Sequence, residues 1–453
     1  MARSRPPAVG ALLARPEVSA LIEKHGHLAV VEALREAVDE LRQRHDGAAS
    51  GHKDDELVPR AKALLRHSPR RLHQVINGTG VVIHTNLGRA PLGGGIAARA
   101  AQVAAGYSNL ELDGTTGRRG DRQDLISTLL CQLGGAEAAM VVNNGAAAVL
   151  LALAALCRGR DVLVSRGEAI EIGGGFRIPD ILRLSGARLV DIGTTNRTRV
   201  GDYLEACGTR TAAFLRVHQS NFSMQGFVVR PEVRELADAA HERGVLLLED
   251  VGSGLIGRPT KAVAAEDRLR ASLGAGVDLL FCSGDKLLGG SQAGLLLGRR
   301  ELIARLRRYP LARALRPDKL QLAVLEETLL CHASPGRLKE IPVWKMLRMD
   351  PDELQTRAKE WSDLLAQGGI ATEVVGCEGA VGGGTTPGVP LPSFGLLLPD
   401  RRPSRLRQRL LRGQPPVVAL EGSAGVVIDA RCVLPGEEQS LLAAIRVAVE
   451  GRD

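Results

Sequence analysis

The sequence predicts an α/β protein built around a mainly parallel sheet, with a small helical domain before the sheet and a smaller α+β domain after it. From residue 73 to 335, strand-sized apolar runs alternate with helical patterns, which is typical of a parallel sheet with helical connections. Residues 1–72 show helical periodicity, and residues 336–453 mix both patterns. A chain of 453 residues is long enough for these three domains.

The composition argues against a disordered chain and against a membrane protein. Charged residues make up 24% and hydrophobic residues 44% of the sequence, as in folded water-soluble proteins. The longest apolar run, residues 146–157, is far shorter than the roughly 20 residues that cross a bilayer. The seven cysteines include no CxxC pair, so we expect neither a metal site nor disulfides. We therefore expect a cytoplasmic protein with no membrane partner.

The excess of basic residues is compatible with a polyanionic partner. Lysine and arginine number 59 against 51 acidic residues, which gives a formal net charge of +8. Arginine outnumbers lysine 50 to nine, a skew that genomic base composition explains, so the charge alone does not identify a partner. Aromatic residues are only 2%, so base stacking is not expected to carry nucleic-acid recognition. If an RNA binds, its shape and its phosphates should dominate recognition, and we expect no DNA partner.

Apolar residues at steps of three and four predict an amphipathic helix over residues 28–41, through Leu28, Val31, Leu34, Val38 and Leu41. A second helix is expected near residues 57–65, after a break at 45–52. Residues 1–72 contain no glycine-rich phosphate loop. With their helical pattern, we expect them to form a small module separate from the α/β domain that follows.

Seven short apolar runs predict the strands of the central sheet, and each is followed by a turn and a helical pattern. The runs are residues 139–142, 161–164, 188–192, 212–217, 245–248, 279–281 and 294–297. The segment after residue 335 carries a glycine cluster at 381–384 and a stretch at 401–412 with six arginines and no acid.

A lysine follows one of these runs almost directly. Lys286 ends the sequence Ser-Gly-Asp-Lys at 283–286, after the run 279–281 and before Gly289 and Gly290. A lysine at the end of a buried strand is costly unless it is neutralised, paired or made into an imine. The pattern fits a lysine that binds pyridoxal phosphate (PLP), with Ser283 on the cofactor phosphate. A solvated loop lysine fits the local pattern equally well.

Asp250 ends the buried run that begins at residue 245, and Gly252 follows it. Ligands bind at the carboxyl ends of strands in open α/β sheets. There Asp250 could keep the pyridine nitrogen of PLP protonated, so that the ring accepts electrons. The alternative is a carboxylate that caps the next helix.

A third element is the turn at Asn144, Gly145 and Ala146, between the run 139–142 and an alanine-rich segment. Backbone N–H groups at a helix N-terminus bind anions, here the cofactor phosphate. Any strand-to-helix turn looks similar when taken alone. The three elements in this order predict a fold-type-I PLP enzyme, that is, an aspartate aminotransferase-like transferase core.

Histidines and arginines supply further candidates. His84 and His218 each fit an active-site role or a structural one. Arg313 and Arg316 lie in a basic stretch at 299–319, where a shared helix face would form a fork for an oxyanion. A solvated face is the alternative there. The stretch 401–412 can likewise be a solvated face, or it can bind the phosphate backbone of a nucleic acid.

A series of longer motifs resembles bacterial selenocysteine synthase, the L-seryl-tRNA(Sec) selenium transferase family. The resemblance runs from about residue 70 to the C-terminus, with Gly145 and Ser291 as departures from asparagine and proline in the family pattern. The motifs are VINGTG (75–80), HTNLGRAPL (84–92), YSNLE (107–111), TGRRG (116–120), SRGE (165–168), EIGGGFRIPD (171–180), GTTNRT (193–198), SNF (220–222), GDKLLGG (284–290) and VGGG (381–384).

The resemblance implies a role for each candidate residue. Lys286 would bind PLP as an imine and, once freed, act as general base, while Asp285 and Arg119 assist departure of the hydroxyl group. Selenophosphate would be held by Arg89, Arg313 and Arg316. The expected cofactor-binding residues are Lys286, Asp250, Ser283, Asn144, Gly145, Ala146 and His218.

The resemblance also implies the reaction and the partners. L-Seryl-tRNA(Sec) would lose its serine hydroxyl to give an aminoacrylyl-tRNA, and selenium from selenophosphate would add to give L-selenocysteinyl-tRNA(Sec). Residues 1–72 would recognise the tRNA body, and the stretch 401–412 would guide the acceptor arm. Such enzymes assemble as homodecamers, five dimers with active sites at the dimer interfaces. The alternatives are a PLP lyase or transferase acting on a free amino acid, and a non-catalytic RNA-binding protein, which should have lost Lys286.

Overall fold

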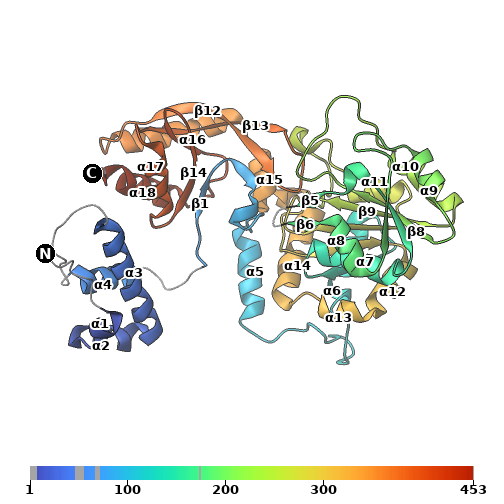
Figure 1. Cartoon of the computed structure of the whole chain (residues 1–453), viewed down its shortest axis with the longest axis horizontal. Coiled ribbons are helices and arrows are strands. Elements are labelled where there is room, and N and C mark those ends of the chain that lie inside the picture. Colours follow the sequence, from blue (N-terminus) through green and yellow to red (C-terminus); the bar gives the residue numbers. More distant parts are fainter. Residues whose placement is uncertain (1–7, 46–55, 67–71, 173–174, 452–453) are drawn as a thin grey trace. The chain divides into compact units, whose positions relative to one another are not determined.

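The computed structural model describes residues 8–45, 56–66, 72–172 and 175–451, and the chain divides into two compact units (Figure 1). The first unit is Met1–Gln74 and the second is Val75–Asp453. The predicted boundary near residue 335 lies inside the second unit, and the three-domain division stays a prediction.

The described residues of the first unit form a small helical bundle. Both predicted helices are present, and residues 46–55 of the chain between them lie outside the described part. Leu34 and Val38 are buried as the periodicity predicts, together with Leu57 and Ala61 of the next helix, whereas Leu28 in the first helical turn is 76% exposed. The helices are α1 Val9–Leu13, α2 Pro16–His25, α3 His27–His45 and α4 Leu57–Arg66.

The second unit contains the predicted central sheet, with strand order β3-β11-β10-β9-β8-β4-β7. Each predicted run forms one of its strands. Five of the strands pair in parallel, and only β11 runs antiparallel to its neighbours β10 and β3. The strands are β3 Ala138–Val142, β4 Asp161–Ser165, β7 Arg188–Ile192, β8 Thr211–Val217, β9 Leu246–Gly252, β10 Leu279–Ser283 and β11 Gly294–Gly298.

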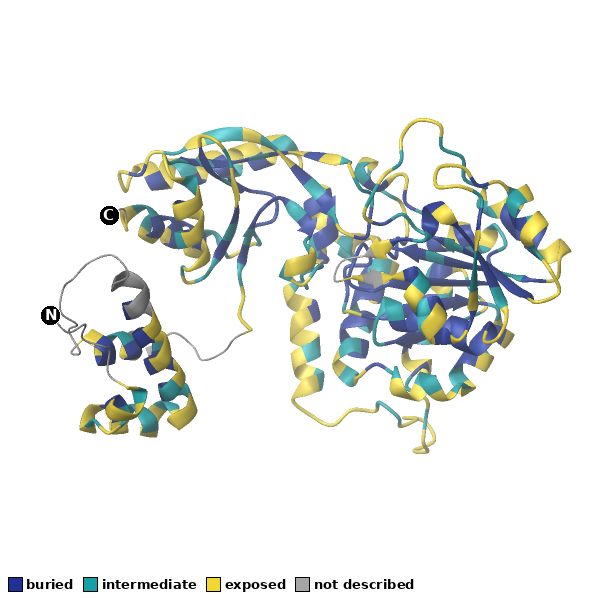
Figure 2. Ribbon diagram, in the orientation of Figure 1, coloured by how far each residue is buried: buried dark blue, intermediate teal, exposed yellow. Residues whose placement is uncertain are grey.

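Helices cover both faces of this sheet, which explains why the strands are continuous apolar runs rather than alternating ones (Figure 2). One face packs against α7 Gly145–Leu156, α8 Ile178–Ser185, α12 Arg300–Arg308 and α13 Pro310–Ala314. The other face packs against α6 Asp124–Gly134, α9 Val200–Ala206, α10 Val233–Glu242, α11 Leu269–Gly274 and α14 Lys319–Ala333.

A second, six-stranded sheet has the order β1-β14-β15-β13-β12-β2. Its two outer strands, β1 Ile76–Gly78 and β2 Val81–Ile83, come from far earlier in the chain than the other four (Figure 1). The others are β12 Glu373–Gly382, β13 Pro390–Pro399, β14 Val417–Glu421 and β15 Gly425–Asp429, with α16 Pro351–Ala366, α17 Pro403–Leu411 and α18 Glu438–Glu450 packed on one face.

Shorter elements complete the second unit. They are α5 Gly94–Ala104, the hairpin of β5 Glu171–Ile172 and β6 Phe176–Arg177, and α15 Pro342–Leu347. Residues 173–174, part of the longest glycine motif, lie outside the described residues. Within the described ranges, no helix combines the length and the apolar character that a bilayer span requires.

Candidate active site

Lys286 lies in the loop between β10 and β11, which backbone hydrogen bonds hold in place. Gly284 N–H donates to Ala293 O at 2.9 Å, and Gly290 N–H donates to Gly284 O at 2.8 Å. Leu287 N–H donates to Ser253 O at 2.9 Å, which ties the turn to the segment after β9. Lys286 itself is only 7% exposed, so the alternative of a solvated loop lysine is wrong.

Burial disfavours the charged form of Lys286 and of the carboxyl group that faces it. Burial lowers the pKa of Lys286, and the attraction of Asp250 opposes this shift only in part. Burial likewise raises the pKa of Asp250, against the opposing effects of Lys286 and of the Gly252 N–H. An amine with a lowered pKa has a larger neutral fraction near pH 7 and is therefore a better nucleophile.

Lys286 lines a cavity of about 250 Å³ that we call the cofactor cavity. The cavity lies where β3, β8, β9 and β10 end, because each of these parallel strands places its following residues at the same edge of the sheet. All the residues predicted to bind the cofactor line it, and so does Arg89. They are Asn144, Gly145, Ala146, His218, Asp250, Ser283 and Lys286.

The turn before α7 has the form of an anion site. The Asn144 side chain accepts from Ala147 N–H at 2.8 Å, and Asn144 O accepts from Ala148 N–H at 3.2 Å. The N–H groups of Gly145 and Ala146 have no partner within the helix, and both residues line the cavity. A Cβ atom on Gly145 would lie 2.6 Å from Ser283 Oγ, so glycine lets that serine approach the helix end.

Two observations show that the cavity fits a polar, planar cofactor such as PLP. His218 Nδ1 and Ser220 Oγ are buried without a hydrogen-bond partner among the described residues, although both residues line the cavity. Buried polar atoms are rarely left unpaired, because this costs free energy. The helix end also offers two N–H donors to a phosphate, and Asp250 offers a carboxylate to a ring nitrogen. PLP carries both groups.

His218 is held by a residue that no sequence motif indicated. Its Nε2 atom lies 3.3 Å from Oε1 of Glu266, a buried carboxylate that also accepts from Thr386 Oγ1 at 3.2 Å. Glu266 lies in the irregular segment after β9, where neither periodicity nor spacing marks a functional residue. By contrast, His84 does not line the cavity.

The glycine cluster at 381–384 brings a distant segment to Lys286. A Cβ atom on Gly384 would lie 2.5 Å from both Cε and Nζ of Lys286, and Gly384 has a φ of +81°. Gly384 N–H donates to Ser220 O at 3.0 Å, which fixes the loop after β12 over the lysine. Only glycine adopts this backbone without strain and leaves the amino group its space.

Arg89 and Asp285 form an ion pair beside the cavity. Arg89 Nη1 donates to Oδ1 and Oδ2 of Asp285 at 3.1 and 3.0 Å, and Ala90 N–H donates to Asp285 O at 3.2 Å. Arg89 has a φ of 65°, which is rare for a residue other than glycine. Such conformations cluster at functional sites.

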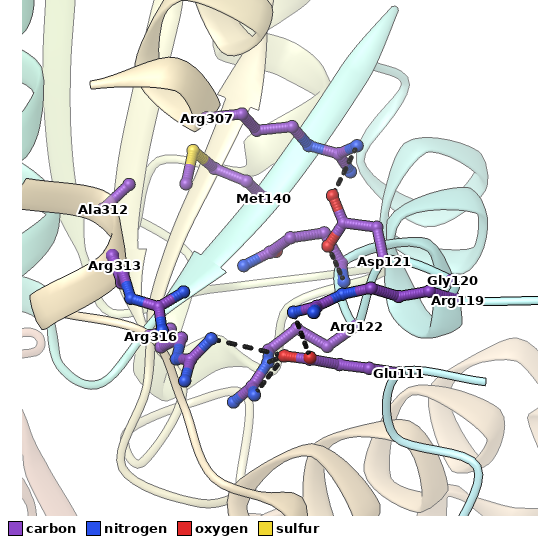
Figure 3. Close-up of a pocket in the computed structure, with 11 residues that line it drawn as sticks. Glu111, Arg119, Gly120, Asp121, Arg122, Met140, Arg307, Ala312, Arg313 and Arg316 are labelled. Atoms are coloured by element: carbon purple, nitrogen blue, oxygen red, sulfur yellow. Dashed lines mark hydrogen bonds and ion pairs between the residues drawn. The ribbon is translucent and has the colours of Figure 1, made fainter. Parts of the chain in front are cut away.

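The remaining predicted residues, Arg119, Arg313 and Arg316, line a different pocket of about 460 Å³ (Figure 3). We call it the arginine pocket, and Glu111, Asp121, Arg122 and Arg307 also line it. The prediction that Arg313 and Arg316 share one helix face is wrong, because α13 ends at Ala314. In the single chain, the residues predicted to hold selenophosphate are thus divided, with Arg89 in the cofactor cavity and the other two here.

The basic stretch at 401–412 contains the whole of α17 and the residues that flank it. Arg401, Arg402, Arg405 and Arg409 line a surface hollow, whereas Arg407 pairs with Glu421 at 3.0 Å. This hollow lies on the six-stranded sheet domain, away from the residues that line the cofactor cavity.

Comparison with known protein families decides the relationship. Residues 75–434 match the family model described as L-seryl-tRNA selenium transferase, and residues 4–42 match one described as selenocysteine synthase N terminal. The chain belongs to the L-seryl-tRNA selenium transferase family. The resemblance seen in the motifs is confirmed.

Individual relatives in this family match over nearly the whole chain. A protein named L-seryl-tRNA(Sec) selenium transferase from Moorella thermoacetica is 42% identical over 463 residues, covering 98% of this chain and 96% of the relative. One of the same name from Geobacter sulfurreducens is 40% identical over 456 residues and covers 98% of each chain.

Solved structures support the fold. D-Glucosaminate-6-phosphate ammonia-lyase superposes with a TM-score of 0.60 at 20% sequence identity, covering 84% of this chain and 96% of that chain. The predicted fold-type-I architecture of PLP-dependent enzymes is confirmed.

Proposed function

We propose that this chain converts L-seryl-tRNA(Sec) into L-selenocysteinyl-tRNA(Sec), as a PLP-dependent selenium transferase. The observation that carries the proposal is the cofactor cavity: a buried lysine, a facing carboxylate and a helix-end anion site, in a chain that belongs to this family. An RNA-binding protein without catalysis would have no reason to keep a lysine buried at this cost.

PLP is the cofactor that family membership implies, and bound in the cavity it would supply an electron sink for bonds at the serine Cα. Lys286 would hold it covalently, and Asp250 would meet its ring nitrogen. The N–H groups of Gly145 and Ala146, with Ser283 Oγ, would bind its phosphate. His218, held through Nε2 by Glu266, keeps its unpaired Nδ1 for the same ligand.

The chain's own groups then account for the proton movements. We assign removal of the seryl Cα proton to Lys286, because burial lowers the pKa of its amino group and so favours the neutral base. Departure of the β-hydroxyl needs a proton or a cation close to the oxygen, and we assign this assistance to Asp285 and Arg119. Arg119 lines the arginine pocket rather than the cofactor cavity, so in a dimer the second chain would supply it. The loop at Gly384 packs closely against the amino group of Lys286.

We assign selenophosphate to Arg89, Arg313 and Arg316, since guanidinium groups bind phosphate in a bidentate manner. These arginines line two separate pockets of one chain, so a single chain does not complete the clamp. We propose that a second chain of a dimer supplies the missing part. The homodecamer implied by the resemblance would contain such dimers.

The tRNA is assigned to the two basic regions outside the catalytic core. The helical unit at the N-terminus matches the family's own N-terminal model over residues 4–42, which supports a role in binding the tRNA body. The hollow formed by Arg401, Arg402, Arg405 and Arg409 offers guanidinium groups to the phosphates of the acceptor arm.

The test is the visible absorption spectrum of the purified protein, recorded with seryl-tRNA(Sec), with free serine, and with seryl-tRNA(Sec) after ribonuclease treatment. We expect the band of lysine-bound PLP to change only with intact seryl-tRNA(Sec), and Lys286→Ala to lack the band. A band that responds to free serine would indicate an enzyme of free amino acids instead. The absence of any band with PLP supplied would overturn the catalytic proposal.

A further inference from the structure

Glu111 lines the arginine pocket and bonds to three arginines at once (Figure 3). Its Oε1 atom accepts from Arg122 Nε at 3.1 Å, from Arg122 Nη2 at 2.5 Å and from Arg316 Nη1 at 3.3 Å. Its Oε2 atom accepts from Arg119 Nη2 at 2.8 Å. A single carboxylate therefore occupies donors that could bind an anionic ligand.

The three arginines differ in how firmly they are held. Arg122 is mostly buried and also donates to Pro317 O at 2.6 Å, so its bond with Glu111 is part of the framework. The side chain of Arg119 is 76% exposed, and that of Arg316 is 35% exposed. The exposed pair with Arg119 is weak because solvent screens it, and the partly buried contact with Arg316 is long at 3.3 Å, so these two arginines can leave Glu111 at low cost.

The pocket carries a surplus of positive charge even with Glu111 in place. Five arginines face two acids, and Asp121 lies 3.7 Å from Arg307, which also pairs with Asp124 at 3.1 Å. Within the described residues, Arg313 forms no ion pair. The pocket therefore suits a ligand with more negative charge than one carboxylate provides.

We propose that Glu111 is a built-in counter-ion of the arginine pocket, which a phosphate-bearing ligand must displace from Arg119 and Arg316 in order to bind. This inference rests on the assignment of the pocket to selenophosphate under the proposed function. A phosphate dianion offers more charge and more acceptor oxygens than a carboxylate. It therefore displaces Glu111 from Arg119 and Arg316, while Glu111 stays bound to Arg122.

The same competition works in reverse when the phosphate product leaves. A tethered carboxylate returns to Arg119 and Arg316 as soon as they are free, so Glu111 limits how tightly the pocket retains phosphate. The hydrogen bonds from Arg122 lower the pKa of Glu111, which keeps the competing group ionised. Glu111 thus sets the affinity of the pocket without touching the reacting atoms.

The test measures binding of inorganic phosphate to the full-length, PLP-loaded protein by isothermal titration calorimetry. Glu111→Gln keeps the size of the side chain and removes its charge, and we expect it to bind phosphate about tenfold more tightly. Glu111→Asp keeps the charge but shortens the reach, so its affinity should fall between. Glu205→Gln, on α9 at the opposite edge of the sheet, removes the same charge and should change nothing.

A merely structural role for Glu111 predicts the opposite sign, because arginines that lose their organising partner would bind phosphate more weakly. Unchanged or weaker binding by Glu111→Gln would overturn the inference. Arg313→Ala separates this failure from that of the proposed function. If phosphate binding weakens in Arg313→Ala but does not strengthen in Glu111→Gln, only the inference fails. If Arg313→Ala has no effect, the pocket is not the anion site and both fail.

Discussion

The cofactor cavity and the arginine pocket handle charge in opposite ways. In the cofactor cavity, burial shifts the pKa values of Lys286 and Asp250 toward their neutral forms. In the arginine pocket, guanidinium groups lower the pKa of Glu111 and so favour its charged form. Salt hardly weakens the interactions between buried charges, and adding or removing one atom at a buried site has a large effect. At an open site salt screens the charges, and a substitution has a smaller effect. The first arrangement suits a permanent cofactor, and the second suits an anion that comes and goes.

The largest expected effect is that of Lys286→Ala, which removes the covalent attachment and the proposed base together. Activity with seryl-tRNA(Sec) should fall on the order of 10⁴-fold or more, as when other covalent catalysts lose their nucleophile. The visible band of lysine-bound PLP should vanish, while the fold persists because the substitution removes a buried amine. Lys359→Ala, at an exposed position on α16, is the matched control and should keep both band and activity. A normal spectrum in Lys286→Ala would show that PLP is not attached through this lysine.

Asp250→Asn should rank second. The amide cannot stabilise a protonated ring nitrogen, so activity should fall by about a hundredfold or more, in line with the loss of a preorganised charge. PLP should still bind, because Lys286 and the phosphate turn remain. The measurement is kcat together with the pH dependence of the visible band. An unchanged rate would show that this carboxylate caps the turn, through its hydrogen bond with Gly252 N–H, and does no more.

Gly384→Ala probes the closeness of packing in the cavity. The added methyl group would contact Lys286 Nζ, so attachment of PLP should slow by about tenfold, with a strain cost of about 1–2 kcal/mol from the positive φ. Gly436→Ala has the same strain, since Gly436 has a φ of +89°, but its methyl group would enter open space. If both variants lose stability and only Gly384→Ala binds PLP slowly, the contact is the cause. Equal rates would show that the lysine simply moves aside.

The two sites also differ in how far the sequence predicts them. Lys286, Asp250 and the turn at Gly145 each follow a strand directly, so local patterns indicate them, and parallel strands bring their ends together. Glu266 and the loop at Gly384 reach the cavity from an irregular segment and from the other sheet, and no local pattern points to Lys286 as their neighbour. Their contacts depend on tertiary packing alone.

The sequence predicts only part of the arginine pocket, because the carboxylate that joins its arginines comes from a distant segment. Arg313 and Arg316 stand out as a basic cluster, but Glu111 joins Arg316 across 205 positions of sequence. An acid among many charged residues gives no signal of its own. Local patterns also do not predict the two short strands at residues 76–83. Three residues are too few to show a periodicity, and the pairing of these strands with β14 and β12 is long-range.

Ionic strength should separate the sites with a smaller effect. Raising salt from about 50 to 500 mM shortens the Debye length well below 10 Å, so phosphate binding in the arginine pocket should weaken several-fold. Retention of PLP in the buried cavity should stay nearly constant over the same range. The measurement is phosphate affinity and PLP occupancy in the same samples, with Arg316→Ala as a variant whose affinity should depend less on salt. Equal salt dependence at both sites would show that the cofactor cavity is screened by salt as strongly as the arginine pocket.

The smallest expected effect lies in the stability of the PLP-free protein as pH changes. Burial lowers the pKa of Lys286 in the folded chain, whereas in the unfolded chain the amine keeps its proton up to about pH 10.4. Between these two values the unfolded chain binds more protons, so stability rises with pH across that window. Lys286→Met lacks this contribution, and its advantage in melting temperature over the PLP-free wild type should therefore shrink from pH 7 to pH 10. The raised pKa of Asp250 makes stability fall as pH rises, but this effect belongs to the acidic pH range. The two proteins are therefore compared above pH 7. A difference in melting temperature that stays constant with pH would mean that the amine is fully charged in the folded cavity, which would contradict the nucleophilic state assigned to it.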